Sequence, residues 1–507
     1  SSPRGLSTPQ TLILVDGRAQ PSTPSGSGTT LQADLNGLPL DMIERIEILP
    51  STASGIYGGG ALGGVINVIT RKDYSGVDLR LNYNNTFASD AASRRVDLSG
   101  SFQLEGGKTM LTVNISRLTS TSLTVQDRDL QDRGRALLLD NNAAAFFGTA
   151  TPPVGYLTNI RNTTAANLVL KNGTVLNSNY TFVPAGYQGP ATDAGQALVA
   201  NAGRYNLDLP DSIGGRRSGL LAVPEQKSYG LSLRRRFGSW LEVLLDGNQF
   251  QNTGSRIVNL VGATTTLSAT APNNPFTTPV ALAFPATNIT AEAVTETTSS
   301  RFLAGLVVRL PARWSAGLDY VWARTRQRGR VPQVVVGDPD GTGPGLSYTA
   351  ALAAGALNVM RDLNAYPLDY TAYLMPEPNL RSNAMFRTDE VTVRGSGPLR
   401  RLPAGEMTLS VSALYRYERT PGNVRSTPSS ASPAIAYSYE PTVGLETRAY
   451  TAELNVPVFA ADAASGWRRG LELQLAARRD EGMATVRGDS PSGISVAGPD
   501  GPFPGVS

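Results

Sequence analysis

The sequence contains no cysteine and no histidine. Without cysteine there can be no disulfide, no thiolate nucleophile and no cysteine metal site. Without histidine the chain lacks the commonest general base and the commonest transition-metal ligand. An enzyme built on this chain would have to work with carboxylates, Ser, Tyr or Arg alone. We therefore expect no catalysis, no cofactor and no bound metal.

Lysine and long apolar runs are scarce as well. Only four of the 45 basic residues are lysines, and 41 acidic residues leave a formal net charge of +4. These charges form no basic stripe, so we expect no nucleic-acid partner. No run of about 18 apolar residues occurs, which argues against a transmembrane helix. No signal peptide opens the chain, which begins mid-pattern at Ser1.

The first 70 residues predict a small α+β unit. Thr11–Val15 is a compact apolar strand that ends in a turn at Asp16–Arg18, and a loop rich in Pro, Ser, Gly and Thr follows over Gln20–Thr30. The pattern then predicts a short helix over Leu38–Ile43 and a strand over Val65–Thr70.

From Val77 onwards the pattern has period two. Val77, Leu79 and Leu81 face one way, while the polar residues between them face the other. The same alternation recurs in about eleven segments, most of them about 10 residues long, which is the length that a tilted strand needs to cross a bilayer. A half-buried sheet in a soluble protein would alternate in the same way, so the loops must decide between the two.

The connections between these strands alternate between short and long. The tight turns lie at 105–108, 238–239, 311–313 and 401–405, and the long connections at approximately 120–227, 251–298, 327–384 and 419–444. Alanine-rich stretches near 194–203 and 349–362 predict helices inside the long connections. Outer-membrane barrels have short periplasmic turns and long extracellular loops, whereas soluble domains rarely carry such loops. The pattern therefore favours an antiparallel transmembrane β-barrel.

One glycine motif points elsewhere. Gly58–Gly63 matches the G-x-G-x-x-G fingerprint of dinucleotide-binding proteins. That motif requires a helix directly after the glycines, but here a strand follows at Val65. We interpret the glycines as a tight turn.

Several blocks resemble the plug signature of TonB-dependent outer-membrane receptors. They occur in the order and spacing of that family, and together they are specific. The blocks are Arg4–Leu6 with Leu12–Arg18, Asp34–Asn36 with Leu38–Pro39, Ile43–Leu49, Ala53–Gly58 and Gly63–Arg71. Looser resemblance continues over the rest of the chain.

The resemblance implies a 22-stranded barrel closed by a plug. It assigns residues 1–72 to the C-terminal part of the plug and 73–481 to the first half of the barrel. Residues 482–507 would be an incomplete loop or strand region. It implies an outer-membrane location in a Gram-negative bacterium, contact with outer-membrane lipid, and energised uptake of a scarce ligand driven by the TonB complex of the inner membrane.

The same resemblance implies that parts of such a receptor are missing from this chain. The first plug strands and the TonB box do not appear before Ser1, and about half of the expected strands do not appear after Glu481. Unpaired strand edges in lipid leave backbone groups unsatisfied at high cost. We therefore expect this chain to be a fragment that cannot transport by itself.

Two sets of site residues follow from the resemblance. The apical plug loop would contact ligand through Arg18, Gln20, Ser22, Thr23, Ser25 and Ser27. A polar network between plug and inner barrel wall would contain Glu44, Arg45, Glu47, Arg80, Arg234 and Arg309. A solvated loop and ordinary surface charges are the alternative interpretations.

Two other functions compete with transport. The chain could be an outer-membrane adhesin or structural barrel, although neither needs a plug. It could also be a soluble all-β carbohydrate-active enzyme or lectin, which would have to manage without histidine. The ligand itself is not readable from the sequence: siderophores, cofactors, oligosaccharides and peptides all remain open.

Overall fold

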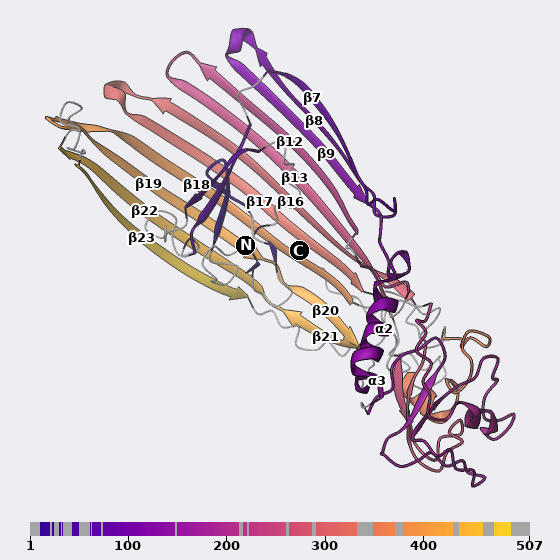
Figure 1. Ribbon diagram of the computed structural model, residues 1–507. Coiled ribbons are helices and arrows are strands. Elements are labelled where there is room, and N and C mark those ends of the chain that lie inside the picture. Colours follow the sequence, from indigo (N-terminus) through magenta and orange to yellow (C-terminus); the bar gives the residue numbers. More distant parts are fainter. Residues whose placement is uncertain are drawn as a thin grey trace.

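The computed structural model of the chain has three parts: a small plug sheet, a large curved sheet and a compact cap (Figure 1). The structure describes residues 11–20, 23–24, 30–31, 33, 43–49, 61, 63–71, 75–147, 150–211, 216–220, 223–259, 263–285, 290–331, 348–370, 380–428, 435–459 and 471–487.

Eleven antiparallel strands form the large sheet, which we call the wall. Its spatial order is β23-β22-β19-β18-β17-β16-β13-β12-β9-β8-β7. Their bounds are β7 Gly76–Asn84, β8 Ser93–Leu104, β9 Thr109–Ser120, β12 Val223–Phe237, β13 Leu241–Asn259, β16 Thr290–Arg309, β17 Ser315–Val331, β18 Leu380–Leu402, β19 Gly405–Thr420, β22 Thr442–Phe459 and β23 Leu471–Arg487. The predicted mainly-β class and the expected number of strands are confirmed, and the described residues form an open sheet rather than a closed barrel.

The wall buries its polar face and exposes its apolar face. On β8, Asp97 is 6% exposed, whereas its neighbours Val96 and Leu98 are 46% and 40% exposed. Register carries this alternation across the sheet, because Leu98 pairs with Ile115, which pairs with Tyr229. A soluble sheet would bury the apolar side instead. We call the polar side the inner face and the apolar side the outer face.

Short turns join the strands at one end of the wall. Two of them contain 3-10 turns, η4 (Glu105–Gly107) and η7 (Pro311–Arg313). Gly106 and Gly107 take positive φ angles of 64° and 83°, a conformation that glycine adopts without a Cβ clash. The long connections all leave from the opposite end, so the predicted alternation holds.

Three of these long connections fold together into one cap. Residues 150–211, 263–285 and 348–370 come from the connections after β9, β13 and β17. They share one apolar core that includes Ile160, Phe276 and Met360, each fully buried. Burial raises the pKa of Tyr187, whose hydroxyl donates to Asp193 at 2.7 Å. The cap elements are β10 Asn159–Asn162, β11 Tyr180–Phe182, η6 Gln196–Asn201, β14 Thr264–Leu267, β15 Val280–Ala283 and α4 Tyr348–Ala354.

Two of the cap elements correspond to the helices predicted inside the loops. Element η6 lies within 194–203 and α4 overlaps 349–362. The connection that leads from β9 to the cap adds η5 (Val125–Asp127), α2 (Leu130–Asn142) and α3 (Ala144–Phe147). None of the helices in the described residues is long and apolar enough to span a membrane.

The plug sheet has the order β2-β1-β6-β5. Strand β1 (Leu12–Val15) pairs in parallel with β6 (Val65–Thr70), which pairs antiparallel with β5 (Ile43–Leu49); β2 is Arg18–Ala19. Two further hairpins are β3 (Thr23–Pro24) with β4 (Thr30–Leu31), and β20 (Asn423–Pro428) with β21 (Ile435–Glu440). Of the predicted helix over 38–43, residues 38–42 lie outside the described residues, and Ile43 begins β5.

Candidate functional site

The candidate site is the seam between the plug sheet and the inner face of the wall. It begins at the turn between β1 and β2, where Asp16 and Gly17 have φ angles of 54° and 76°. Two consecutive positive φ values are typical of a tight hairpin turn, which Asp-Gly favours. The Asp16 carboxylate accepts from the backbone N–H and the hydroxyl of Thr70 at 3.0 and 2.8 Å. This turn is therefore tied to β6 and directs Arg18 away from the plug sheet.

A small apolar contact lies at the centre of the seam. Val15 and Val68 of the plug sheet pack with Phe250 of β13, and all three are at most 5% exposed. Burying a few side chains of this size stabilises an interface by about 1.5–3 kcal/mol per side chain. The remaining contacts of the seam described below are polar.

Arg18 makes an ion pair across the seam. Its guanidinium lies 3.3 Å from Asp319 of β17, whose carboxylate also lies 2.7 Å from Arg394 of β18. Asp319 is 7% exposed and Arg18 is 19% exposed at their side chains. Gly305 on β16 leaves room for this carboxylate, since a Cβ there would lie 2.5 Å from its Oδ1.

Arg301 makes the second polar link. This β16 residue is 3% exposed and donates to the backbone carbonyl of Val15 at 3.4 Å and to the Asp246 carboxylate at 3.2 Å. A charged donor on a backbone carbonyl positions the plug strand without depending on its side chains. The plug and the wall thus meet through two polar links, Arg18 with Asp319 and Arg301 with the Val15 carbonyl.

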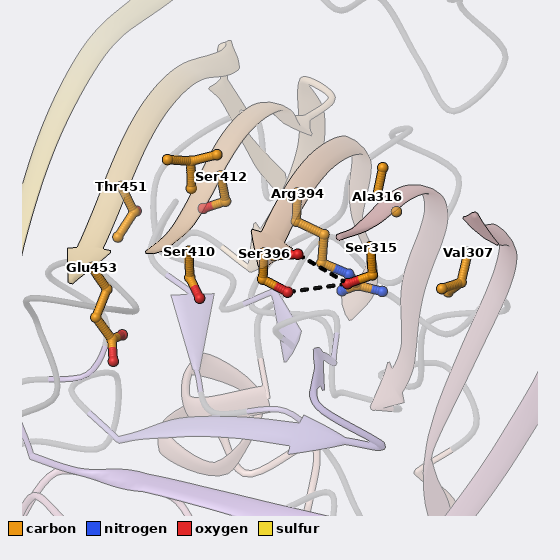
Figure 2. Close-up of a pocket in the computed structure, with 12 residues that line it drawn as sticks. Val307, Ser315, Ala316, Arg394, Ser396, Ser410, Ser412, Thr451 and Glu453 are labelled. Atoms are coloured by element: carbon orange, nitrogen blue, oxygen red, sulfur yellow. Dashed lines mark hydrogen bonds between the residues drawn. The ribbon is translucent and has the colours of Figure 1, made fainter. Parts of the chain in front are cut away.

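Cavities lie within and beside the seam. One of about 30 Å³ is lined by plug residues such as Asp16 and Thr70 and by wall residues such as Asn114 and Asp246; a polar space of this size can hold about one water. A second, of about 320 Å³, lies on the inner face near the short turns. Figure 2 shows its polar lining, in which the Ser315 hydroxyl lies 3.1 Å from that of Ser396. The lining comprises Val307, Ser315, Ala316, Gly317, Arg394, Gly395, Ser396, Ser410, Val411, Ser412, Thr451 and Glu453.

The predicted ligand loop is only partly described. Arg18 contacts Asp319 of the wall. Gln20 donates its backbone N–H to the Ile13 carbonyl at 3.1 Å, and its side-chain Nε2 is buried without a hydrogen-bond partner among the described residues. Thr23 begins β3. Ser22, Ser25 and Ser27 lie outside the described residues, and ligand contact by this set stays a prediction.

Each residue of the predicted polar network makes a local contact. Arg45 lies 2.6 Å from Glu44 and 2.9 Å from Glu47, and all three side chains of β5 are exposed. The three wall arginines make contacts within the wall: Arg80 with Asp78, Arg234 with Glu242, and Arg309 with the Ser239 carbonyl. A plug–wall role for these six residues stays a prediction.

Sequence reasoning did not single out the charged wall residues at the seam. Asp246, Arg301, Asp319 and Arg394 each occupy a polar position of an alternating strand. A usable signal was present: each lies in the interior of a strand on its polar side, far from the loops, where a charge needs a partner. The pattern does not show which of these charges meets the plug, because that depends on where the plug sits.

Comparisons with known proteins agree with this arrangement. Residues 2–65 match the family model of the TonB-dependent Receptor Plug Domain. The N-terminal part of the chain therefore belongs to the plug domain family of the TonB-dependent receptors. Members of this family are transporters and not enzymes, which agrees with the expectation from the missing histidine and cysteine. Among the described residues, no group of three or more acidic side chains is arranged to hold a metal ion.

Curated relatives align with the chain over limited regions. The chain is 47% identical over 73 residues to the iron-regulated outer membrane virulence protein of Vibrio cholerae, covering 14% of this chain and 11% of that protein. It is 34% identical over 134 residues to the ferric enterobactin receptor of Pseudomonas aeruginosa, covering 25% and 17%.

A solved structure of the latter receptor, a variant in complex with enterobactin, matches the fold. The TM-score is 0.50 at 15% identity, and the match covers 94% of this chain and 51% of that one. The chain thus spans about half the length of the solved receptor. At this identity the match shows the fold alone.

Proposed function

We propose that this receptor takes up a ferric siderophore or a similar scarce ligand across the outer membrane, driven by the TonB complex. The observation that carries this proposal is the polar character of the seam. A plug held by Arg18–Asp319 and Arg301–Val15, with a water-sized cavity beside it, can separate from the wall without exposing a large apolar surface. An adhesin or a structural barrel has no need of such a seam.

Within this proposal the parts of the chain have separate tasks. Residues 1–72 act as the plug, 73–481 as the barrel wall with its extracellular loops, and 482–507 as an incomplete loop or strand region. Strand β23 of the wall continues past that bound to Arg487, and residues 488–507 lie outside the described residues. The loop with Arg18, Gln20, Ser22, Thr23, Ser25 and Ser27 would face the ligand below the cap. The buried Gln20 amide offers a donor there.

We also propose that a working transporter contains more strands than these. Strands β7 and β23 are the two edges of the described wall, and open edges in hydrocarbon leave backbone groups unsatisfied at a cost of several kcal/mol each. Expression of this chain alone should give no heat-resistant monomer in outer membranes. Recovery of such a monomer would contradict the proposal.

Tethering the plug tests the transport proposal. Because this chain has no cysteine, a V15C/F250C pair in the complete receptor introduces the only thiols within these 507 residues, at a position where the two side chains pack together. Oxidation should abolish uptake of radiolabelled iron presented on a panel of siderophores, and a reductant should restore it. Ligand binding at the cell surface should persist in both states.

A matched control places the same cross-link inside the wall. Ser101 and Thr112 are partners on β8 and β9, and their hydroxyls lie 3.2 Å apart. A S101C/T112C pair should leave uptake unchanged on oxidation, since it does not connect the plug. Full uptake through a verified Val15–Phe250 tether would instead show that the plug does not need to separate from the wall.

A further inference from the structure

Asp319 of the wall has two cationic partners, one on the plug and one on the wall itself. Its Oδ1 lies 3.3 Å from the guanidinium of Arg18, and its Oδ2 lies 2.7 Å from the guanidinium of Arg394 on β18. The Asp319 side chain is 7% exposed, and a carboxylate buried to this degree needs a partner. With the plug in place it has two. If the plug separates, Arg394 is the one that stays.

Two glycines of the wall make room for this pair. Gly305 is the register partner of Asp319 on β16, and a Cβ there would lie 2.5 Å from the carboxylate. Gly317 is the register partner of Arg394, and a Cβ there would lie 2.9 Å from its Nε and 3.1 Å from its Cγ. The Arg394 side chain therefore lies across Gly317 and reaches Asp319 two positions further along β17. Residues of the wall alone thus bring Arg394 to Asp319.

Arg394 also has access to solvent that does not depend on the plug. Its side chain is 46% exposed, and it lines the cavity of about 320 Å³ shown in Figure 2. Every residue of that lining, given above, belongs to the wall. The position of Arg394 and its contact with solvent should therefore stay the same when the plug moves away.

The second polar link of the seam has the same construction. Arg301 is 3% exposed and donates to the Val15 carbonyl of the plug. It also lies 3.2 Å from the carboxylate of Asp246 on β13. Once Val15 has moved away, Asp246 remains as the partner of this buried guanidinium. In both links, a buried charge of the wall that contacts the plug also has a counterion on the wall.

We propose that Arg394 facilitates release of the plug, because it remains paired with Asp319 when Arg18 leaves. Removing one partner of a buried ion pair is costly, since the other charge is left unpaired, and Arg394 prevents this in the separated state. In the seated state, Arg18 and Arg394 flank one carboxylate and repel each other. Both effects lower the free energy that separation requires. This role rests on the proposed function, in which the plug separates from the wall during uptake.

Substitution of Arg394 should therefore tighten the seam, whereas loss of an ordinary stabilising contact would loosen it. The measurement is the rate at which a maleimide labels V15C in the complete receptor, because Val15 is 2% exposed while the plug is in place. Arg394→Gln should slow this labelling on the order of tenfold, since the separated state then contains an unpaired Asp319. Arg394→Lys keeps the cation and should restore most of the rate. The same receptor without V15C corrects for labelling elsewhere.

The matched control is Arg416→Gln, which removes the same charge from the same face. Arg416 pairs with Glu390 of β18 at 2.6 Å, and it lies four positions along β19 from Ser412, the register partner of Arg394. In the described part of the chain, no plug residue makes an ion pair with Glu390. The labelling rate should stay unchanged in this variant. In an Asp319→Asn background, Arg394→Gln should have no effect either, because the carboxylate that needs a counterion is gone.

The outcomes separate this role from the proposed function. Unchanged or faster labelling of V15C in Arg394→Gln, or equal slowing in Arg416→Gln, would overturn the role of Arg394 alone. If V15C was never labelled while uptake proceeded, the separation of plug and wall would be overturned, and this role with it. Should Arg394→Gln fail to insert, Asp246→Asn provides the measurement at the second link and should also slow the labelling.

Discussion

The wall and the cap bury opposite kinds of side chains. The wall exposes Leu98 and Phe302 and buries Asp97 and Arg301. The cap does the reverse, because Phe276 and Phe284 are fully buried in a core that three loops share. Which side chains are buried therefore depends on the medium that each region meets, lipid or water.

This difference shows where stability resides in each part. In the cap, apolar burial among neighbouring loops holds residues distant in sequence together; Thr158, for example, donates to the Val359 carbonyl at 3.0 Å. In the wall, strand pairing holds the sheet, and the inner face keeps polar residues for contacts with the plug. The cap is a compact unit with an apolar core, built from the connections between wall strands.

The largest effect should come from the cap core. Phe276→Ala removes a fully buried ring and should destabilise the cap by about 3–5 kcal/mol. Protease cleavage within 150–211 of the receptor in outer membranes should accelerate accordingly. The matched variant Phe302→Ala removes the same ring from the lipid side and should leave cleavage of the cap unchanged. Equal acceleration in both would mean that cap and wall unfold as one unit.

A charge on the outer face should have the next largest effect. Leu98→Arg places a cation among exposed apolar side chains of β8 and should cost about 2–4 kcal/mol if that face meets hydrocarbon. The readout is the urea midpoint of the receptor in vesicles. Ser99→Arg, one residue along on the inner face, should cost much less. Similar costs for the two variants would argue against a lipid-facing outer side.

Loss of Arg301 should weaken the seam while leaving the wall and the cap folded. Arg301→Ala removes the donor to the Val15 carbonyl and to Asp246, a charged hydrogen bond that contributes about 1.5–3 kcal/mol. In a V15C background the thiol should become more reactive towards a maleimide, because the plug separates more often. Arg309→Ala, which removes only a contact to the Ser239 carbonyl, should not change that reactivity.

The wall could be predicted from the sequence because the patterns that indicate its strands and turns are local. Period-two alternation and the spacing of short turns are visible within about 15 residues, so strands such as β8 and β9 and their number follow directly. The plug blocks were specific for the same reason. The sequence did not predict that the loops fold into one cap. Its core brings together Ile160, Phe276 and Met360 from three loops, and no local sequence pattern indicates that these residues are in contact.

The site shows the same limit. Arg18 was predicted for the ligand loop, and the structure places it against Asp319, 301 positions away in the sequence. Its partner lies on a strand whose inner face carries other polar residues as well, Ser315 and Thr325 among them. Only the seating of the plug selects Asp319 from the other polar residues.

The smallest expected effect is a difference between Arg18 and Arg45, two arginines of the plug sheet. Arg45 lies on the exposed side of β5 and pairs with Glu44 and Glu47 of the same strand, and exposed pairs contribute little. Arg18 instead bridges to the buried carboxylate of Asp319, which would be left with Arg394 alone. We expect Arg45→Ala to leave the V15C thiol as protected as in the natural seam, whereas Arg18→Ala should raise its maleimide reactivity measurably. If Arg45→Ala raised the reactivity as much, then β5 would contact the wall directly, as the sequence-based network proposed.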